Sequence, residues 1–167
     1  TEWKIKSGEI IPYTESADKL PAISKYYDYD EGAPGKSAQS NGITCIYRYA
    51  EVLLMYAEAS TRATNSVNQD ALNAIQEVQK RAGYQDRQIE LTTTTEPTAF
   101  LAAVSNERGW EFFAEMKRWF ELVRLEKVKE VRAEEWDAST FNTNHHYYFP
   151  VPYQQVDLAG WTNNAGY

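Results

Sequence analysis

The sequence of 167 residues contains a single cysteine, Cys45, and two histidines. One cysteine excludes a disulfide within the chain and any zinc site built from several thiolates. No stretch approaches the run of about 18 apolar residues that a membrane-spanning helix needs. Basic residues are also few, because 17 lysines and arginines face 24 acidic residues and the net charge is −7. Such a chain lacks the positive surface that binds nucleic acid or anionic lipid.

Apolar and aromatic residues are abundant instead. They make up 43% and 14% of the chain, which supplies enough material for a packed core and argues against disorder. A length of 167 residues suits one domain or a large part of one. The chain begins with threonine, and its first ten residues lack the pattern of a signal peptide. We therefore expect the sequence to be part of a longer protein, with its targeting segment outside this chain.

The stretch YRYAEVLLMYAEAS repeats Tyr-Ala-Glu after seven residues. Apolar side chains recur around most of this helix, and polar ones form a narrow stripe in which Arg48 can pair with Glu51 and Glu58 with Arg62. A helix of this kind is packed on several sides, whereas a two-stranded coiled coil has one narrow seam. We predict an interior helix over residues 46–62. Its side chains with expected structural roles are Arg48, Tyr49, Glu51, Tyr56 and Ala57.

A second helix is expected to complete a hairpin over residues 46–83. Residues 66–69 (SVNQ) fit a capping box at its start, and Gly83 suits the position just after its end. Its apolar stripe consists of Ala71, Ile75, Val78 and Ala82. The spacing fits one unit of the tetratricopeptide type. Because a single such unit cannot bury its own face, it must lean on other parts of the fold.

The rest of the chain divides into three regions. Residues 1–45 indicate a lead-in rich in loops and strands, with a short strand or hairpin in WKIKSGEII. Residues 97–131 indicate helix with a break near 115–118, and residues 139–167 indicate an extended tail laid over the helices. The predicted fold is mostly α, with short strands and long irregular loops, in one domain that spans 1–167.

Three carboxylates of the third region, Glu107, Glu111 and Glu115, are spaced four apart on one helix face. That spacing could serve a metal or acid–base chemistry. No histidine stands at the helical offset of a metal ligand, so we interpret the face as structural. The expected partners are Arg108, Lys117 and Arg118.

Arg108 needs an explanation of its own, because it falls on the apolar stripe between Val104 and Phe112. A buried arginine without a partner costs several kcal/mol, so we expect a carboxylate from another helix to hold it. The aromatic side chains of this region recur at helical spacing and are expected in the core. They are Trp110, Phe112, Phe113, Trp119 and Phe120. Glu107, Arg108, Arg118 and Trp119 complete the set of predicted structural residues.

Aromatic rings beside polar side chains suit carbohydrate, because a sugar presents C–H faces that stack on rings and hydroxyl groups that need polar partners. Two clusters have this mixture. The candidate carbohydrate-binding residues are Tyr26, Tyr27, Tyr29, Trp161 and Asn163. The alternative interpretation is that these rings pack the loop and the tail onto the helices.

Metal sites have weak support. Asp28, Asp30 and Glu31 have the alternating acidic spacing of a calcium loop, but the full EF-hand pattern is missing, and a solvated loop is the alternative. His145 and His146 are adjacent, so in an extended segment they would point to opposite sides and not share one ion. No nucleophile elbow is present. We therefore assign no catalytic residue, no metal site and no cofactor.

Four segments in order resemble one known family. They are IYRYAEVLLMYAEA, a hairpin partner that ends in RAG, NERGWEFFAEMKRWFELVRLEK, and YYFPVP with a terminal NNAGY. Together they resemble the C-terminal part of the SusD/RagB family over roughly residues 43–167. The chain departs from the family pattern at Gly109, where arginine is usual, and at Met116, where glycine is usual.

The resemblance implies a non-catalytic function. Members are surface-exposed lipoproteins of the Bacteroidetes outer membrane, anchored by a lipidated cysteine that would lie outside this chain. They bind oligosaccharide or other nutrients and act with a SusC-like TonB-dependent transporter in starch and polysaccharide utilization. The resemblance implies that this chain is a largely structural C-terminal portion, whose partners are a glycan or nutrient ligand and the transporter.

Two other functions stay open at this point. A tetratricopeptide-like scaffold for protein interaction would show a repeat every 34 residues or so, and only one unit is visible. A glycan hydrolase would need two facing carboxylates roughly 5–10 Å apart in an open cleft, and no motif indicates such a pair.

Overall fold

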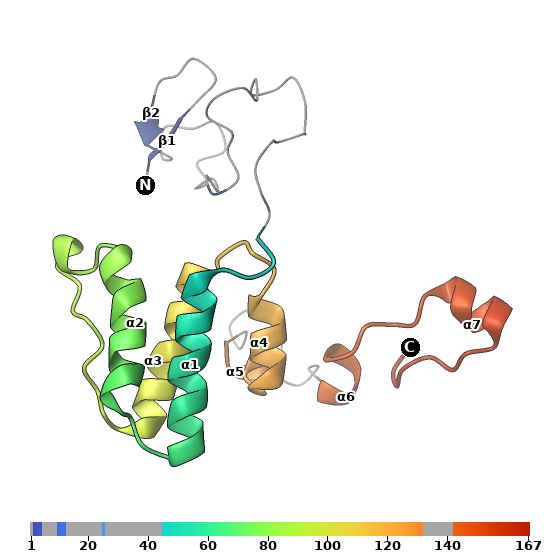
Figure 1. The fold of residues 1–167 in the computed structure, drawn as a ribbon. Coiled ribbons are helices and arrows are strands. Elements are labelled where there is room, and N and C mark those ends of the chain that lie inside the picture. Colours follow the sequence, from blue (N-terminus) through green and yellow to red (C-terminus); the bar gives the residue numbers. More distant parts are fainter. Residues whose placement is uncertain (1, 5–9, 13–24, 26–44, 132–141) are drawn as a thin grey trace. The chain divides into compact units, whose positions relative to one another are not determined.

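The computed structural model describes residues 2–4, 10–12, 25, 45–131 and 142–167. Helices account for most of them, as Figure 1 shows. The chain forms two compact units, residues 1–114 and residues 115–167. The predicted mostly helical class is confirmed.

The strands of the first unit are short. β1 (Glu2–Lys4) pairs with β2 (Ile10–Pro12) in antiparallel register, with Trp3 opposite Ile11. This is the short hairpin that the alternation in WKIKSGEII indicates.

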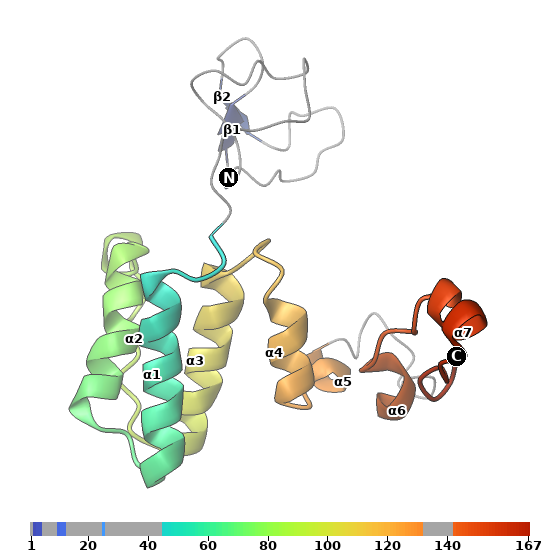
Figure 2. The ribbon, with the colours of Figure 1, turned by 45° about the vertical axis from the view of Figure 1, so that its right-hand side comes forward.

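Three helices of the first unit lie side by side (Figures 1 and 2). They are α1 (Tyr49–Thr64), α2 (Gln69–Arg81) and α3 (Pro97–Glu111), with the 3-10 turn η2 (Gln85–Arg87) after α2. Their shared core consists of Leu54, Ala57, Ala71, Leu72, Ala74, Ile75, Val78, Phe100, Val104 and Phe112. The predicted hairpin is therefore present, and α3 covers the face that the hairpin alone leaves open.

The ends of α2 show how local chemistry sets the hairpin. The Oδ1 atom of Asn68 accepts a hydrogen bond of 2.8 Å from the backbone N–H of Ala71, so the capping residue is Asn68 and the predicted box at residues 66–69 is wrong. At the other end Gly83 has φ +77°, which favours glycine. The prediction for Gly83 is confirmed.

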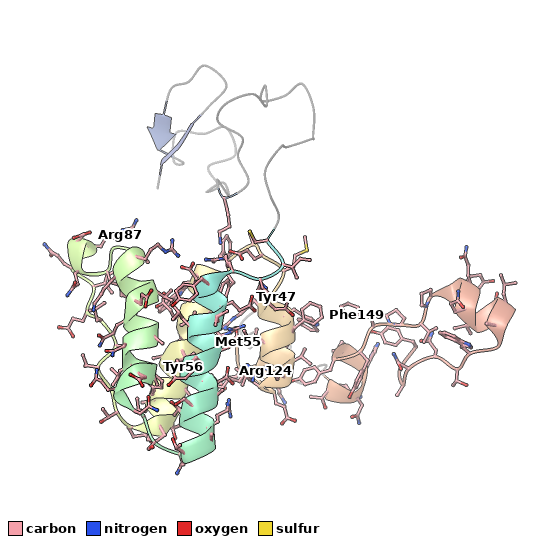
Figure 3. All side chains as sticks on the ribbon, viewed as in Figure 1. Tyr47, Met55, Tyr56, Arg87, Arg124 and Phe149 are labelled. Atoms are coloured by element: carbon pink, nitrogen blue, oxygen red, sulfur yellow. The ribbon has the colours of Figure 1, made fainter. Side chains whose placement is uncertain are left out.

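The orientation of α1 differs from the expectation. Glu51 and Glu58 of the polar stripe are buried, together with Leu54, Ala57 and Thr61. Most apolar side chains of the opposite face are exposed, and Figure 3 shows two of them, Met55 and Tyr56, on this helix. Tyr49 is 66% exposed and Tyr56 45%. In the part of the chain that the structure describes, α1 packs mainly through the side that carries Glu51 and Glu58, so the prediction of packing on several sides is wrong there.

The second unit has four helices in its described residues. They are α4 (Arg118–Arg124), α5 (Val128–Val131), α6 (Thr143–His146) and α7 (Tyr153–Ala159). Leu122 and Val128 are its buried apolar side chains among these residues. The tail is less extended than the sequence indicates, since Asn142 caps α6 through a hydrogen bond from the N–H of Asn144.

The predicted break between α3 and α4 is present, and Ala114 and Met116 have positive φ there. The aromatic side chains around this break differ in their exposure. Phe112 is buried, whereas Trp110, Phe113 and Phe120 are about two-thirds exposed, with fractions of 65%, 63% and 64%. The prediction that these three belong to the core is wrong, because helical spacing does not reveal which face of a helix is covered.

Candidate functional site

Glu111, at the end of α3, joins all three helices of the first unit. Its carboxylate pairs with Arg48, which precedes α1, and with Arg81 of α2. Arg48 also donates a hydrogen bond of 2.7 Å to the backbone carbonyl of Glu111. The Glu111 side chain is only 6% exposed. Arg48 thus contacts a residue that lies 63 positions away in the chain.

Arg108 is paired with a carboxylate from another helix, as we predicted from its position on the apolar stripe. Its guanidinium lies 3.5 Å from the carboxylate of Glu51 on α1, and both side chains are buried. The guanidinium groups of Arg108 and Arg48 also lie over the ring of Phe112, at 5.3 Å and 4.6 Å from its centroid, which adds cation–π attraction. The ion pairs at this end of α3 thus connect it to α1, to the residue before α1 and to α2.

Glu107 is the least exposed of the buried carboxylates among the described residues, with 1% of its surface accessible. Its Oε2 atom accepts hydrogen bonds from the Tyr84 hydroxyl at 2.6 Å and from Gln79 Nε2 at 3.1 Å. Burial and the hydrogen bond to Glu107 raise the pKa of Tyr84 above its ordinary value, and the charge of Glu111 adds to the effect. The Tyr84 phenol therefore stays neutral and acts as a donor.

A cavity of about 470 Å³ opens beside this network, a size within the range of about 300–1,000 Å³ that small-molecule sites have. It lies between α2, the segment that follows η2, and α3. The side chains that matter here are Tyr84, Ile89, Glu90, Thr92, Asn106 and Trp110.

Hydrogen bonds fix the wall of this cavity at Thr92. Gln79 Nε2 donates to Thr92 Oγ1 at 2.8 Å, and Gln79 Oε1 accepts from the Thr92 N–H at 2.9 Å. Gln76 donates to the Thr92 carbonyl at 2.8 Å. Three hydrogen bonds therefore attach the segment after η2 to α2 at Thr92.

In the tail, Asn163 has a structural contact. Its Oδ1 atom accepts hydrogen bonds from the N–H groups of Val151 at 2.8 Å and Asn164 at 2.9 Å. Trp161, two residues earlier, is 59% exposed. The Trp161 ring is therefore largely exposed, while the Asn163 oxygen is engaged by the backbone.

The other carbohydrate candidates, Tyr26, Tyr27 and Tyr29, lie outside the described residues, as do the calcium candidates Asp28, Asp30 and Glu31. Within the described part of the chain, no group of three or more His, Cys, Asp or Glu side chains is placed to hold a metal ion.

The two histidines do not point apart. His145 and His146 stack with ring centroids 4.5 Å apart, and His145 also meets the edge of Tyr167 at 4.3 Å. The expectation of opposite sides is wrong because this segment is helical rather than extended.

Sequence reasoning missed Gln79, Tyr84 and Asn106. A signal for Gln79 exists, because it follows Ile75 by four residues on the apolar stripe of α2, and a buried amide must find hydrogen-bond partners. Nothing local in the sequence indicates Asn106 or the exposure of Trp110, since both depend on how α3 packs against the segment after η2.

The described fold is a mostly helical arrangement in which a third helix closes a hairpin and ion pairs connect the three helices. The chain belongs to the SusD family, whose model matches residues 1–167.

Relatives among characterised sequences include two proteins of Formosa agariphila. The chain is 29% identical to SusD-like protein P2 over 97% of its own length and 34% of that protein. It is 27% identical to SusD-like protein P25 over 83% of its own length and 26% of that protein. The chain therefore spans about a third or less of the curated relatives that it matches.

Solved structures show the same likeness. A SusD superfamily protein from Parabacteroides distasonis matches with a TM-score of 0.66 and 28% identity, over 79% of this chain and 29% of that one. A SusD homolog from Bacteroides thetaiotaomicron matches with a TM-score of 0.62 and 26% identity, over 79% of this chain and 30% of that one. Within the described ranges no helix has the length and apolar character needed to cross a membrane.

Proposed function

We propose that this chain is the C-terminal, largely structural portion of a non-catalytic glycan-binding protein of the outer membrane. The whole protein captures oligosaccharide at the cell surface and passes it to a SusC-like TonB-dependent transporter. A lipid anchor outside this chain holds it to the membrane. The observation that carries the proposal is the SusD family match over all 167 residues, because that family binds carbohydrate and acts with TonB-dependent transporters.

The chemistry of the described carboxylates supports a non-catalytic function. Glu107 and Glu111 are the central carboxylates of the α3 face, and both are buried and already engaged by donors or cations. A general acid or base must instead reach a substrate in an open site. These groups therefore suit a scaffold.

The proposal is tested on the full-length protein with a glycan array followed by calorimetry. Binding of at least one oligosaccharide without its cleavage, together with co-purification of a TonB-dependent transporter from native membranes, is the expected result. Release of new reducing ends from a bound oligosaccharide would contradict the non-catalytic assignment. Absence of binding across the array would contradict the ligand class.

A further inference from the structure

We propose that the cavity between α2, the segment after η2 and α3 is a subsite for one neutral sugar unit of an oligosaccharide, with the Trp110 indole as its stacking surface. The inference rests on the proposed function, because it places the ligand class proposed above on particular residues of this chain.

The first argument is the position of the apolar groups. Trp110 lines the cavity and is 65% exposed, and Ile89 on the same cavity is 48% exposed. A large ring that lines a cavity and is exposed to this extent is available to a ligand. Phe112, two residues later, is instead buried in the core. The C–H face of a pyranose matches such a flat apolar surface.

The second argument is the set of polar groups around that ring. Asn106 lies one helical turn before Trp110 on α3, and Glu90 lines the cavity from the segment after η2. Among the described residues, neither side chain takes part in a hydrogen bond or an ion pair. An amide and a carboxylate offer donors and acceptors that match sugar hydroxyl groups.

The third argument is that the wall is already ordered. Thr92 is attached by hydrogen bonds to Gln76 and Gln79, and the Tyr84 hydroxyl donates to buried Glu107. The lone pairs of Tyr84 that remain can accept from a ligand hydroxyl. Because these groups are fixed before binding, a ligand loses less free energy to ordering the site.

Charge then selects the kind of sugar. Glu90 is at the cavity and Glu107 lies directly behind Tyr84. Among the described residues that line the cavity, none is cationic. A uronic acid or a sulfated sugar would place its negative charge near these carboxylates, which is unfavourable in a partly desolvated site. The cavity therefore favours a neutral hexose or pentose unit.

The experiment uses the full-length protein and four probes of equal length: maltohexaose, mannohexaose, xylohexaose and hexagalacturonate. Affinities are measured by calorimetry for the wild type, Trp110→Ala, Asn106→Ala and the control Phe120→Ala, which removes an equally exposed ring outside the cavity. In parallel, Trp110 is oxidised with N-bromosuccinimide with and without each probe, and the modified peptide is quantified by mass spectrometry.

We expect a neutral hexasaccharide to bind, Trp110→Ala to weaken it by about tenfold or more, Asn106→Ala to weaken it less, and Phe120→Ala to leave it unchanged. Bound sugar should also protect wild-type Trp110 from oxidation, a readout that stands even if Trp110→Ala fails to fold.

Three outcomes would contradict the inference. If a neutral probe binds but neither Trp110→Ala nor Asn106→Ala weakens it and Trp110 is not protected, the subsite is overturned and the proposed function is left intact. Preference for hexagalacturonate at Trp110 overturns the neutral-sugar assignment. Binding of no neutral probe overturns the inference, and a blank glycan array would extend that failure to the proposed function.

Discussion

Single side chains connect the helices of the first unit. Glu111 is shared by Arg48 and Arg81, Arg108 meets Glu51, and Tyr84 and Gln79 donate to Glu107. The sequence alone indicates that Arg108 needs a carboxylate, because arginine on an apolar stripe must be paired. It does not indicate which one, since Glu51 lies 57 residues away and the choice depends on how α1 and α3 pack.

The Arg108–Glu51 pair yields the first prediction. Arg108→Met leaves the buried Glu51 carboxylate without its cation, so we expect the free energy of unfolding to fall by about 3 kcal/mol. Adding Glu51→Leu should recover part of the loss, because an apolar pair can replace a buried ion pair. Urea unfolding measures both effects. Glycan affinity should not change in either variant, and an unaltered unfolding midpoint in Arg108→Met would refute a stabilising role for the pair.

Tyr84 provides the second prediction. Its pKa is raised in the folded state by burial and by its hydrogen bond to Glu107. A group with a raised folded pKa contributes stability below its unfolded pKa, near about 10 for tyrosine, and loses that contribution as the pH rises further. We expect Tyr84→Phe to lower stability at neutral pH and to flatten the decline between about pH 9 and 11. Tyr49→Phe is the matched control, since Tyr49 is exposed on α1. An alkaline decline as steep in Tyr84→Phe as in the wild type would argue against the assignment.

For the helices, it was easier to predict from the sequence where they form than which side of each one is buried. The hairpin and the break before α4 follow from period and from turn residues, which act locally. The inward stripe of α1 does not, because Glu51 is buried against Arg108 of α3, 57 residues away. The Glu58–Arg62 pair is local and was predicted, but it does not reveal which side of α1 is covered. The exposure of Trp110, and the cavity that it lines, were not predicted because they also depend on how the helices pack.

The start of α3 gives a prediction at this scale. Glu96 caps the helix by accepting hydrogen bonds from the N–H groups of Ala99 at 2.7 Å and Thr98 at 3.1 Å, and these bonds lower the pKa of its carboxyl. A lowered folded pKa contributes stability above the unfolded pKa, near about 4.3 for glutamate, that is lost as the pH falls. We expect Glu96→Gln to reduce the acid dependence of unfolding below about pH 5.

Thermal unfolding followed by circular dichroism between about pH 3 and pH 7 measures this effect, because that range spans the ordinary glutamate pKa of about 4.3. The matched control is Glu77→Gln, because Glu77 is an exposed carboxylate on α2. An equal change of the acid dependence in both variants would show that general charge, rather than the cap, is responsible.

For the molecule as a whole, the sequence was sufficient for family and class, because four segments in order carry the resemblance. The ligand site was less accessible. Tyr26, Tyr27 and Tyr29 lie outside the described residues, and the oxygen of Asn163, two residues after Trp161, already accepts a backbone hydrogen bond. The cavity between α2, the segment after η2 and α3 depends on how these parts pack together. Composition and spacing alone do not reveal that packing.

The exposed face of α1 leads to a prediction for the chain as a unit. Tyr49, Val52, Met55 and Tyr56 are between 42% and 66% exposed and lie on one side of the helix, and contiguous apolar surface of this kind is uncommon in a soluble monomer. We therefore expect the 167-residue chain to bind a hydrophobic fluorescent dye. The double variant Val52→Glu/Tyr56→Glu should lose most of that fluorescence, whereas Ala59→Glu, one turn further along the same helix, adds charge while removing little apolar surface and should retain it. Equal fluorescence in the double variant and the wild type would show that this face is not the apolar surface exposed in solution, and the packing of α1 on a single side would then need revision.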